Sequence, residues 1–111
     1  MPYLTKERNS ATIVEVSGEL DVAAATHLRE YMGGLFKKAP GKVILDLSGV
    51  GYMASSGLAM LIAAIKNAKE CRVPFGVCGV SPVVRHSLEV AELHAILPIF
   101  NDITEAIRDL K

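Results

Sequence analysis

The sequence predicts an α/β protein with one mixed sheet, and three observations lead to this prediction. Half of the 111 residues are apolar but only 5% are aromatic, so the core must be aliphatic. Short apolar runs alternate with segments whose apolar residues recur at helical spacing. The length suits one core rather than two. The predicted order is β-β-α-β-α-β-α-β-α, with the helices against the sheet, and we expect residues 1–111 to form a single domain.

The N-terminal part is typical of a β-hairpin followed by an amphipathic helix. Strands are predicted over residues 3–8 and 11–17, and a helix over 23–38. Four apolar residues at spacings of four, four and three are expected on its buried face: Ala24, Leu28, Met32 and Leu35. Asp21 lies near the N-terminus of this helix, and the segment Ala39-Pro40-Gly41 ends it.

The middle of the chain predicts a strand, a helix and another strand. Residues 42–47 are a near-continuous apolar run of the kind that is buried on both faces of a sheet. A helix is predicted over 57–69, and the next strand over 73–78. The expected core residues of this helix are Leu58, Leu61, Ile62 and Ile65.

The C-terminal part repeats the alternation of helix and strand. Ser81 is expected to cap a short helix over 82–90, which begins with a proline. A last strand is predicted over 96–100, and one member of the pair Asn101-Asp102 then caps a helix that continues through Leu110. Its expected inward-facing residues are Ile103, Ala106, Ile107 and Leu110.

Charge and hydropathy exclude several classes of partner. Twelve acidic side chains balance twelve basic ones, which argues against direct binding of nucleic acid or attraction to an anionic membrane. No apolar run reaches the roughly 18 residues of a membrane span, and the N-terminus does not resemble a signal peptide. We therefore expect a cytoplasmic protein without membrane insertion, whose partner recognises a local surface.

The cysteines and histidines do not indicate a metal site. Cys71 and Cys78 have no further Cys or His at ligand spacing, so both are interpreted as small core residues in a reducing compartment. His27, His86 and His94 lie in three different segments and are interpreted as surface or helix-face side chains. We predict no bound metal and no cofactor.

The common catalytic motifs are also missing. The chain has no Gly-x-Ser-x-Gly elbow, no phosphate loop ending in Gly-Lys-Ser/Thr and no Gly-x-Gly-x-x-Gly after a strand. An enzyme using Asp21, Asp46 and Ser56 remains an alternative, but no base or set of oxyanion donors accompanies these residues. We therefore predict a binding protein and assign no catalytic residue.

The most informative segment is the junction between the strand at 42–47 and the following helix, where Ser55 and Ser56 precede a glycine. The first amides of a helix lack intrahelical acceptors, so a serine there either caps them or is a site where a phosphate meets free donors. Asp21 and Asp46 are expected at the same edge of the sheet. The structural alternative is that these acids and serines only cap helices and order loops.

Four segments favour the regulatory interpretation, because together they resemble the STAS family and, within it, the bacterial single-domain anti-sigma factor antagonists. They are Gly18-Glu-Leu-Asp21, Val43-Ile-Leu-Asp-Leu-Ser-Gly-Val50, Met53-Ala-Ser-Ser-Gly-Leu58 and Val77-Cys-Gly-Val-Ser-Pro-Val-Val84. The resemblance covers nearly the whole chain. It implies a four- or five-stranded sheet with helices packed on one side.

The resemblance also implies a phosphorylation switch at Ser56, the serine directly before the glycine. The unphosphorylated protein would bind an anti-sigma factor that is also a serine kinase, and so release a sigma factor. Phosphorylation by that partner would end binding until a phosphatase restored the serine. We predict little change of fold on phosphorylation, because the helix N-terminus stabilises the added charge.

The expected partner-binding surface surrounds this serine. Its residues are Asp21, Asp46, Tyr52, Met53, Ala54, Ser55, Ser56 and Gly57. Tyr52, Met53, Met60 and Val22 are candidates for an apolar rim, of which Tyr52 is expected to be exposed. Ala54 stands where the family motif commonly has Asp. This departure favours an alternative function, a docking subunit of a membrane lipid-transport or stress-signalling complex that is not phosphorylated.

Overall fold

A computed structural model describes residues 3–38 and 40–111, and its elements follow the predicted order with one short 3-10 helix added. The strands are β1 (Tyr3–Arg8), β2 (Ala11–Ser17), β3 (Lys42–Gly49), β4 (Phe75–Cys78) and β5 (Ile99–Phe100). The helices are α1 (Val22–Lys37), α2 (Ser55–Cys71), α3 (Pro82–Val90), the 3-10 helix η1 (Leu93–Ala95) and α4 (Ile103–Asp109). Ala39, in the segment expected to end the first helix, lies outside the described residues.

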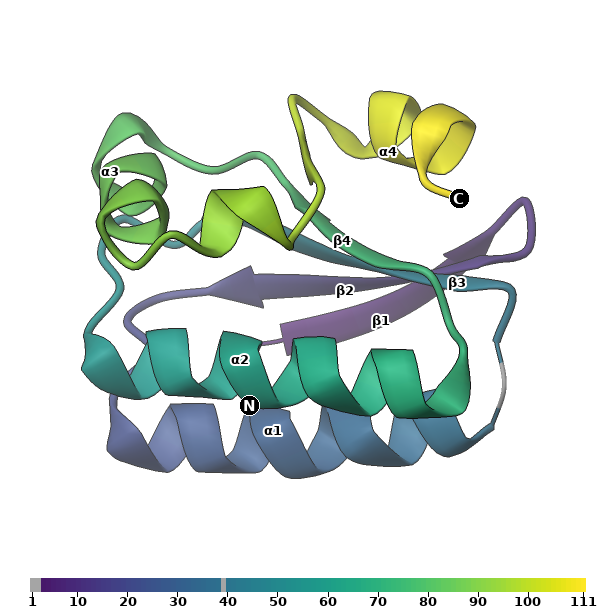
Figure 1. The fold of residues 1–111 in the computed structure, drawn as a ribbon, viewed down its shortest axis with the longest axis horizontal. Helices are drawn as coiled ribbons and strands as arrows, with labels where there is room; N and C mark the ends of the chain where they lie inside the picture. Colours follow the sequence, from purple (N-terminus) through teal and green to yellow (C-terminus); the bar gives the residue numbers. More distant parts are fainter. Residues whose placement is uncertain (1–2, 39) are drawn as a thin grey trace.

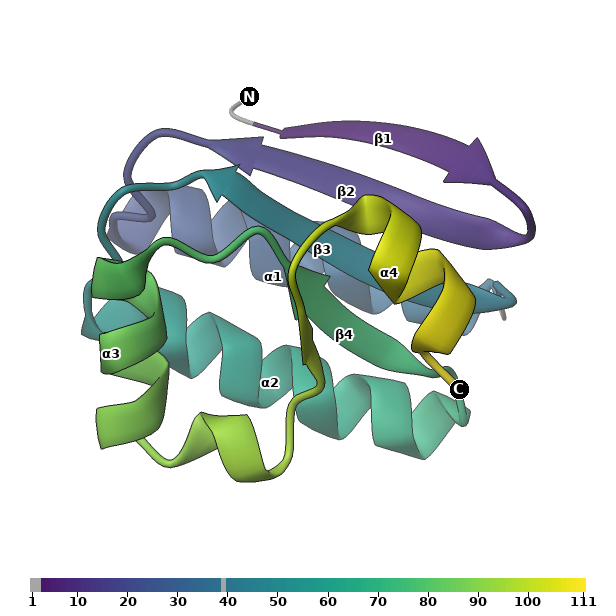
Figure 2. The same cartoon turned by 90° about the horizontal axis from the view of Figure 1, so that it is seen from above.

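The strands form one mixed sheet in the order β1-β2-β3-β4-β5. β1 is antiparallel to β2, and every other neighbouring pair is parallel. Parallel neighbours need crossover connections, which α1, α2 and α3 supply. The three helices therefore all begin where β2, β3 and β4 end, at Ser17, Gly49 and Cys78 (Figures 1 and 2). We call this side of the sheet the carboxyl edge.

Helices cover both faces of the sheet. α1 and α2 lie on one face, and α4 lies on the other (Figures 1 and 2). The expectation that all helices pack on one side is therefore wrong for α4. The reason is visible in β3, where Val43 and Leu45 contribute to the larger core under α1 and α2, whereas Ile44 joins Ala106 and Leu110 in a second core. A strand that is apolar on both faces needs cover on both.

The side of α1 that is buried differs from the predicted one. Its fully buried residues are Ala25, Leu28, Met32 and Phe36, while Ala24 and Leu35 are only partly buried. Both patterns share Leu28 and Met32, so spacing alone does not choose between them. Phe36 determines which face of α1 is buried, because its ring packs edge-on against Phe75 with 5.4 Å between centroids and buries a large apolar area.

Small residues set the position of α2. The helix buries Gly57, Met60, Leu61, Ala64 and Ala68. Leu58 and Ile65 are partly buried, but Ile62, predicted as a core residue, is 51% exposed. Small side chains allow close packing against neighbouring elements, so the helix turns its glycine and alanines inward and leaves Ile62 outside.

The last two strands are shorter than predicted because prolines interrupt them. The strands predicted over 73–78 and 96–100 span only Phe75–Cys78 and Ile99–Phe100. Pro98 accepts a hydrogen bond from the Val77 amide, but as a proline it has no amide to donate. The predicted caps of the following helices are confirmed: Ser81 accepts from the Val84 amide, and Asp102 from the Glu105 amide.

The two cysteines have different environments. Cys78 is buried between the sheet and α4, as predicted, whereas Cys71 is exposed at the end of α2, so its assignment to the core is wrong. Burial, with a smaller contribution from the neighbouring Asp46 carboxylate, raises the pKa of the Cys78 thiol to about 12. The thiolate, which is the reactive form, is thus suppressed at Cys78.

We expect iodoacetamide at pH 8 to alkylate Cys71 in the folded protein and to spare Cys78 until the chain is unfolded. Peptide mapping by mass spectrometry measures this difference, with Cys71→Ser as the control that leaves the native protein unlabelled. Rapid native labelling of Cys78 would contradict the burial.

The raised pKa of Cys78 also affects stability. Its contribution to the free energy of unfolding is fully present below pH 9.0, the ordinary pKa of the thiol, and is lost as the pH rises toward about 12.

Candidate functional site

The N-terminus of α2 lies at the carboxyl edge and has no side-chain cap. Ala54 occupies the N-cap position with extended backbone angles (φ −79°, ψ 175°), and its methyl group accepts no hydrogen bond. Ser55 and Ser56 are the first two residues inside the helix. The structural alternative, in which one of these serines caps α2, is therefore wrong. The amides of Ser55 and Ser56, which have no intrahelical acceptor, keep their capacity to meet an anion, whereas the Gly57 amide donates to the Ala54 carbonyl at 3.0 Å.

Ser56 connects this helix to the loop that precedes α1. Its side chain is partly buried, and its Oγ donates a hydrogen bond to the backbone carbonyl of Leu20 at 3.1 Å. Ser55, the preceding residue, is exposed. The two hydroxyls thus differ: that of Ser56 holds two segments together, and that of Ser55 faces solvent.

The backbone of Asp21 lies close to Ser56, because Asp21 directly follows Leu20, whose carbonyl accepts the Ser56 hydrogen bond. Its Oδ1 accepts a hydrogen bond from the Ala24 amide at 2.8 Å, which caps α1. The capping role that the structural alternative gives Asp21 is thus observed, and the residue remains exposed at the carboxyl edge. A carboxylate is favourable here because it faces the positive end of the α1 dipole.

Asp46 does not belong to this group. It lies on β3 between Leu45 and Leu47, which face α1 and α2, so the alternation of the strand directs its side chain to the opposite face of the sheet. There it is buried, and its Oδ1 accepts from the Ser48 amide at 3.0 Å. Asp46 therefore orders the end of β3 and is separated by the sheet from the surface around Ser56.

The expected apolar rim is reduced to two residues. Tyr52 is 57% exposed, as predicted, and Val22, the first residue of α1, is 72% exposed. Met53 and Met60 are buried in the core instead. Gly57 is also buried, and a Cβ atom on it would lie 2.6 Å from Met53 Cγ, so the glycine lets the loop before α2 pack closely.

A small cavity that is open to solvent lies beside Ser56 and adds a residue that the sequence did not indicate. Its volume is about 160 Å³, and α1 and α2 line it. The lining residues are Val22, Ala25, Thr26, Arg29, Ser56, Ala59 and Met60. Arg29 is the charged member of this set. The helical repeat places Arg29 one turn after Ala25, but only the packing of α1 against α2 brings it to Ser56.

Replacing Ala54 with Asp is expected to stabilise the fold by about 1 kcal/mol, because the carboxylate would accept from the first-turn amides and face the positive end of α2. Chemical denaturation at neutral pH measures the gain. Ala54→Asn is the matched control, since it supplies a cap without charge and should retain most of the effect. A destabilised Ala54→Asp protein would show that these amides are not available.

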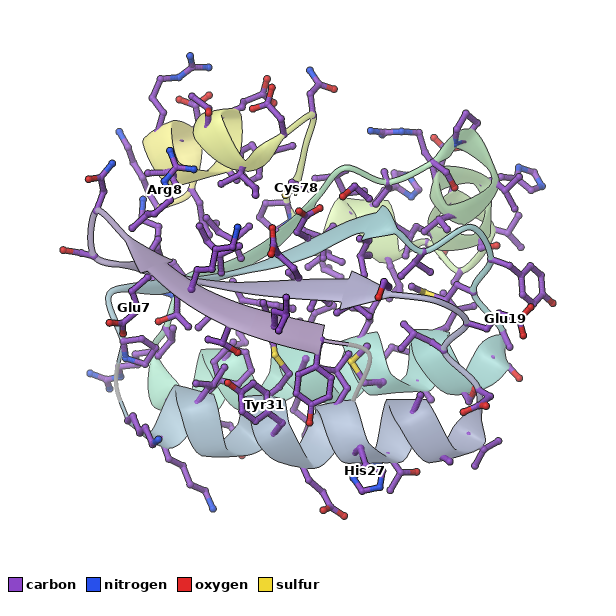
Figure 3. All side chains as sticks on the ribbon, turned by 180° about the vertical axis from the view of Figure 1, so that it is seen from behind. Glu7, Arg8, Glu19, His27, Tyr31 and Cys78 are labelled. Atoms are coloured by element: carbon purple, nitrogen blue, oxygen red, sulfur yellow. The ribbon has the colours of Figure 1, made fainter. Side chains whose placement is uncertain are left out.

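The remaining polar residues give no second site in the described part of the chain. His27 lies on the outer side of α1 and points away from the sheet (Figure 3). His86 and His94 are exposed on other elements. Within residues 3–38 and 40–111, no three His, Cys, Asp or Glu side chains are grouped so that they would hold a metal ion. Over the same residues, no helix has both the length and the apolar character needed to cross a membrane.

Comparisons with known proteins agree with this architecture. Residues 3–106 match the model of the STAS domain. The chain is 26% identical to the anti-sigma-F factor antagonist RsfB of Mycobacterium tuberculosis over 95% of this chain and 85% of that protein. It is 29% identical to the anti-sigma F factor antagonist of Paenibacillus polymyxa over 89% of this chain and 86% of that protein.

A solved structure extends the similarity to three dimensions. The crystal structure of an anti-sigma factor antagonist from Mycobacterium paratuberculosis superposes with a TM-score of 0.85 at 27% identity, covering 96% of this chain and 93% of that one. The sequence motifs, the five-stranded mixed sheet and the family match over residues 3–106 agree with one another. The chain therefore belongs to the STAS domain family.

Proposed function

We propose that this protein is an anti-sigma factor antagonist that phosphorylation of Ser56 switches off. In its unphosphorylated form it binds an anti-sigma factor with serine kinase activity and so releases a sigma factor. Two relatives that match most of the chain carry the name of anti-sigma-F factor antagonists, which supports the class of partner. The kinase step and the later removal of the phosphate by a phosphatase are part of the proposal.

The observation that carries the proposal is the position of Ser56 at the uncapped N-terminus of α2. Asp21 lies next to it, and the exposed side chains of Tyr52 and Val22 are at the same edge of the sheet. A protein partner can cover such a surface, because it combines two apolar side chains with a hydroxyl, an acid and free helix amides. Ser55 adds a second exposed hydroxyl.

Phosphorylation changes the charge of this surface and not its fold. A phosphate brings about −1.5 to −2 charges and three acceptor oxygens, which the N-terminus of α2 stabilises. The partner, however, has to desolvate this anion or oppose it with its own charges, which costs a few kcal/mol. The esterified Oγ also no longer donates to Leu20. Release of the partner then needs no unfolding of α2.

Incubation with the host's anti-sigma kinase and ATP tests the proposal. Intact-mass measurement should show the gain of one phosphoryl group, and fragmentation should place it on Ser56. Ser56→Ala should abolish the gain, while Ser55→Ala, the matched control at the neighbouring hydroxyl, should retain it. Phosphate on Ser55, or a mass gain that survives Ser56→Ala, would contradict the assignment.

One observation favours a second candidate function. Ala54 lacks the carboxylate that the family motif commonly has at this place, so a kinase would meet a changed surface next to Ser56. The alternative is a docking subunit of a larger complex that binds its partner through the same edge without phosphorylation. The kinase experiment separates the two, since tight binding with no mass gain supports the docking subunit.

A further inference from the structure

We infer that Arg29 is the counter-charge of phosphorylated Ser56 and draws the phosphate into the cavity between α1 and α2. This inference rests on the proposed function, because it concerns the phosphorylated form of the same serine. It assigns to Arg29 a role in positioning the phosphate.

The cavity gives the first part of the argument. Its volume of about 160 Å³ is several times the roughly 30 Å³ that one water molecule occupies, so a phosphoryl group fits. Its walls come from α1 and α2, and Ser56 and Arg29 both line it. The other lining residues are neutral, so the guanidinium supplies the charge of the cavity.

The surroundings of the hydroxyl decide the direction of the phosphate. Ser56 Oγ now donates to the Leu20 carbonyl, an acceptor that repels phosphate oxygens once the proton is gone. The next residue, Asp21, belongs to the same loop and carries a carboxylate, whose Oδ1 accepts from the Ala24 amide at 2.8 Å. Repulsion from the loop before α1 and attraction by Arg29 therefore act in the same direction, toward the cavity.

Arg29 is available for this role. Among the described residues the ion pairs are Lys6 with Glu15 and Arg108 with Asp109, so no carboxylate occupies the Arg29 guanidinium. An arginine can form paired hydrogen bonds to two phosphate oxygens, which a lysine cannot match. The phosphate on Ser56 would then lie in the cavity between α1 and α2, with part of its charge neutralised by Arg29.

The test installs phosphoserine at position 56 by genetic-code expansion, so that it needs no kinase and does not depend on whether the kinase step occurs in the cell. ³¹P NMR titration then gives the second pKa of the phosphate, whose ordinary value is about 6. A guanidinium in contact lowers this pKa, so Arg29→Gln should raise it by roughly half a unit or more. Arg29→Lys should give an intermediate value.

Lys37→Gln is the matched control. It removes the same charge from α1, but Lys37 lies eight residues further along the helix, roughly 12 Å away by the helical rise. This substitution should leave the titration of the phosphate unchanged. The Arg29 Nε–H signal should also shift when position 56 carries phosphoserine instead of serine. Equal phosphate titrations in the Arg29→Gln and Lys37→Gln proteins would overturn the inference, whatever the kinase experiment shows.

Discussion

Ser56→Asp is expected to weaken binding to the anti-sigma factor by about 10²-fold or more. The substitution places a negative charge at the carboxyl edge, where the partner would have to desolvate it, at a cost of a few kcal/mol. It also removes the donor that now bonds to the Leu20 carbonyl. Isothermal titration calorimetry of the purified pair measures the change in affinity.

Ser56→Ala distinguishes the effect of the added charge on affinity from the effect of the lost hydrogen bond to Leu20. It removes the same donor without adding an anion, so it should retain most of the affinity. Amide hydrogen exchange of α2 should be no faster in Ser56→Asp than in the parent protein, because an acid in the first helical turn interacts favourably with the dipole. The proposal would be falsified if Ser56→Asp bound as tightly as Ser56→Ala.

Phe36→Ala is expected to lower the free energy of unfolding by about 3–5 kcal/mol, a large fraction of the stability of a domain of this size. The side chain is 1% exposed and packs edge-on against Phe75, so its removal leaves a cavity between α1 and the sheet. Urea denaturation at constant pH measures the loss. Leu28 and Met32 remain in place and should preserve the fold.

Leu35→Ala is the control that distinguishes the observed phase of α1 from the one that the apolar spacing predicts. Leu35 is only partly buried, so its truncation should cost about 1 kcal/mol. The opposite ranking, with Leu35→Ala more damaging than Phe36→Ala, would mean that α1 is rotated about its axis relative to the structure.

Local chemistry explains what the sequence predicted well. Asp21, Ser81 and Asp102 each accept an amide hydrogen bond three residues later, an interaction that depends on residue type and near neighbours alone. Tyr52 is exposed as expected. The order of strands and helices is confirmed for the same reason, because apolar period and turn residues are local properties.

The incorrect predictions concern which neighbour a side chain meets. The structural alternative made Ser56 a helix cap, but its hydroxyl donates to the Leu20 carbonyl, thirty-six residues earlier. Ile62 has the hydropathy of a core residue, but the buried face of α2 consists of Met60, Leu61 and three small residues, Gly57, Ala64 and Ala68. Cys71 has the size of a core residue and lies exposed at the end of the same helix.

By itself, the sequence determined the alternating architecture, three of the helix caps and the junction at which Ser56 lies. Only the tertiary structure decided that Asp21 accompanies this serine while Asp46 lies behind the sheet, and that Arg29 faces the same cavity. The physical reason is that pattern and propensity act over a few residues, whereas these relations depend on how β3 is paired and how α1 packs on α2.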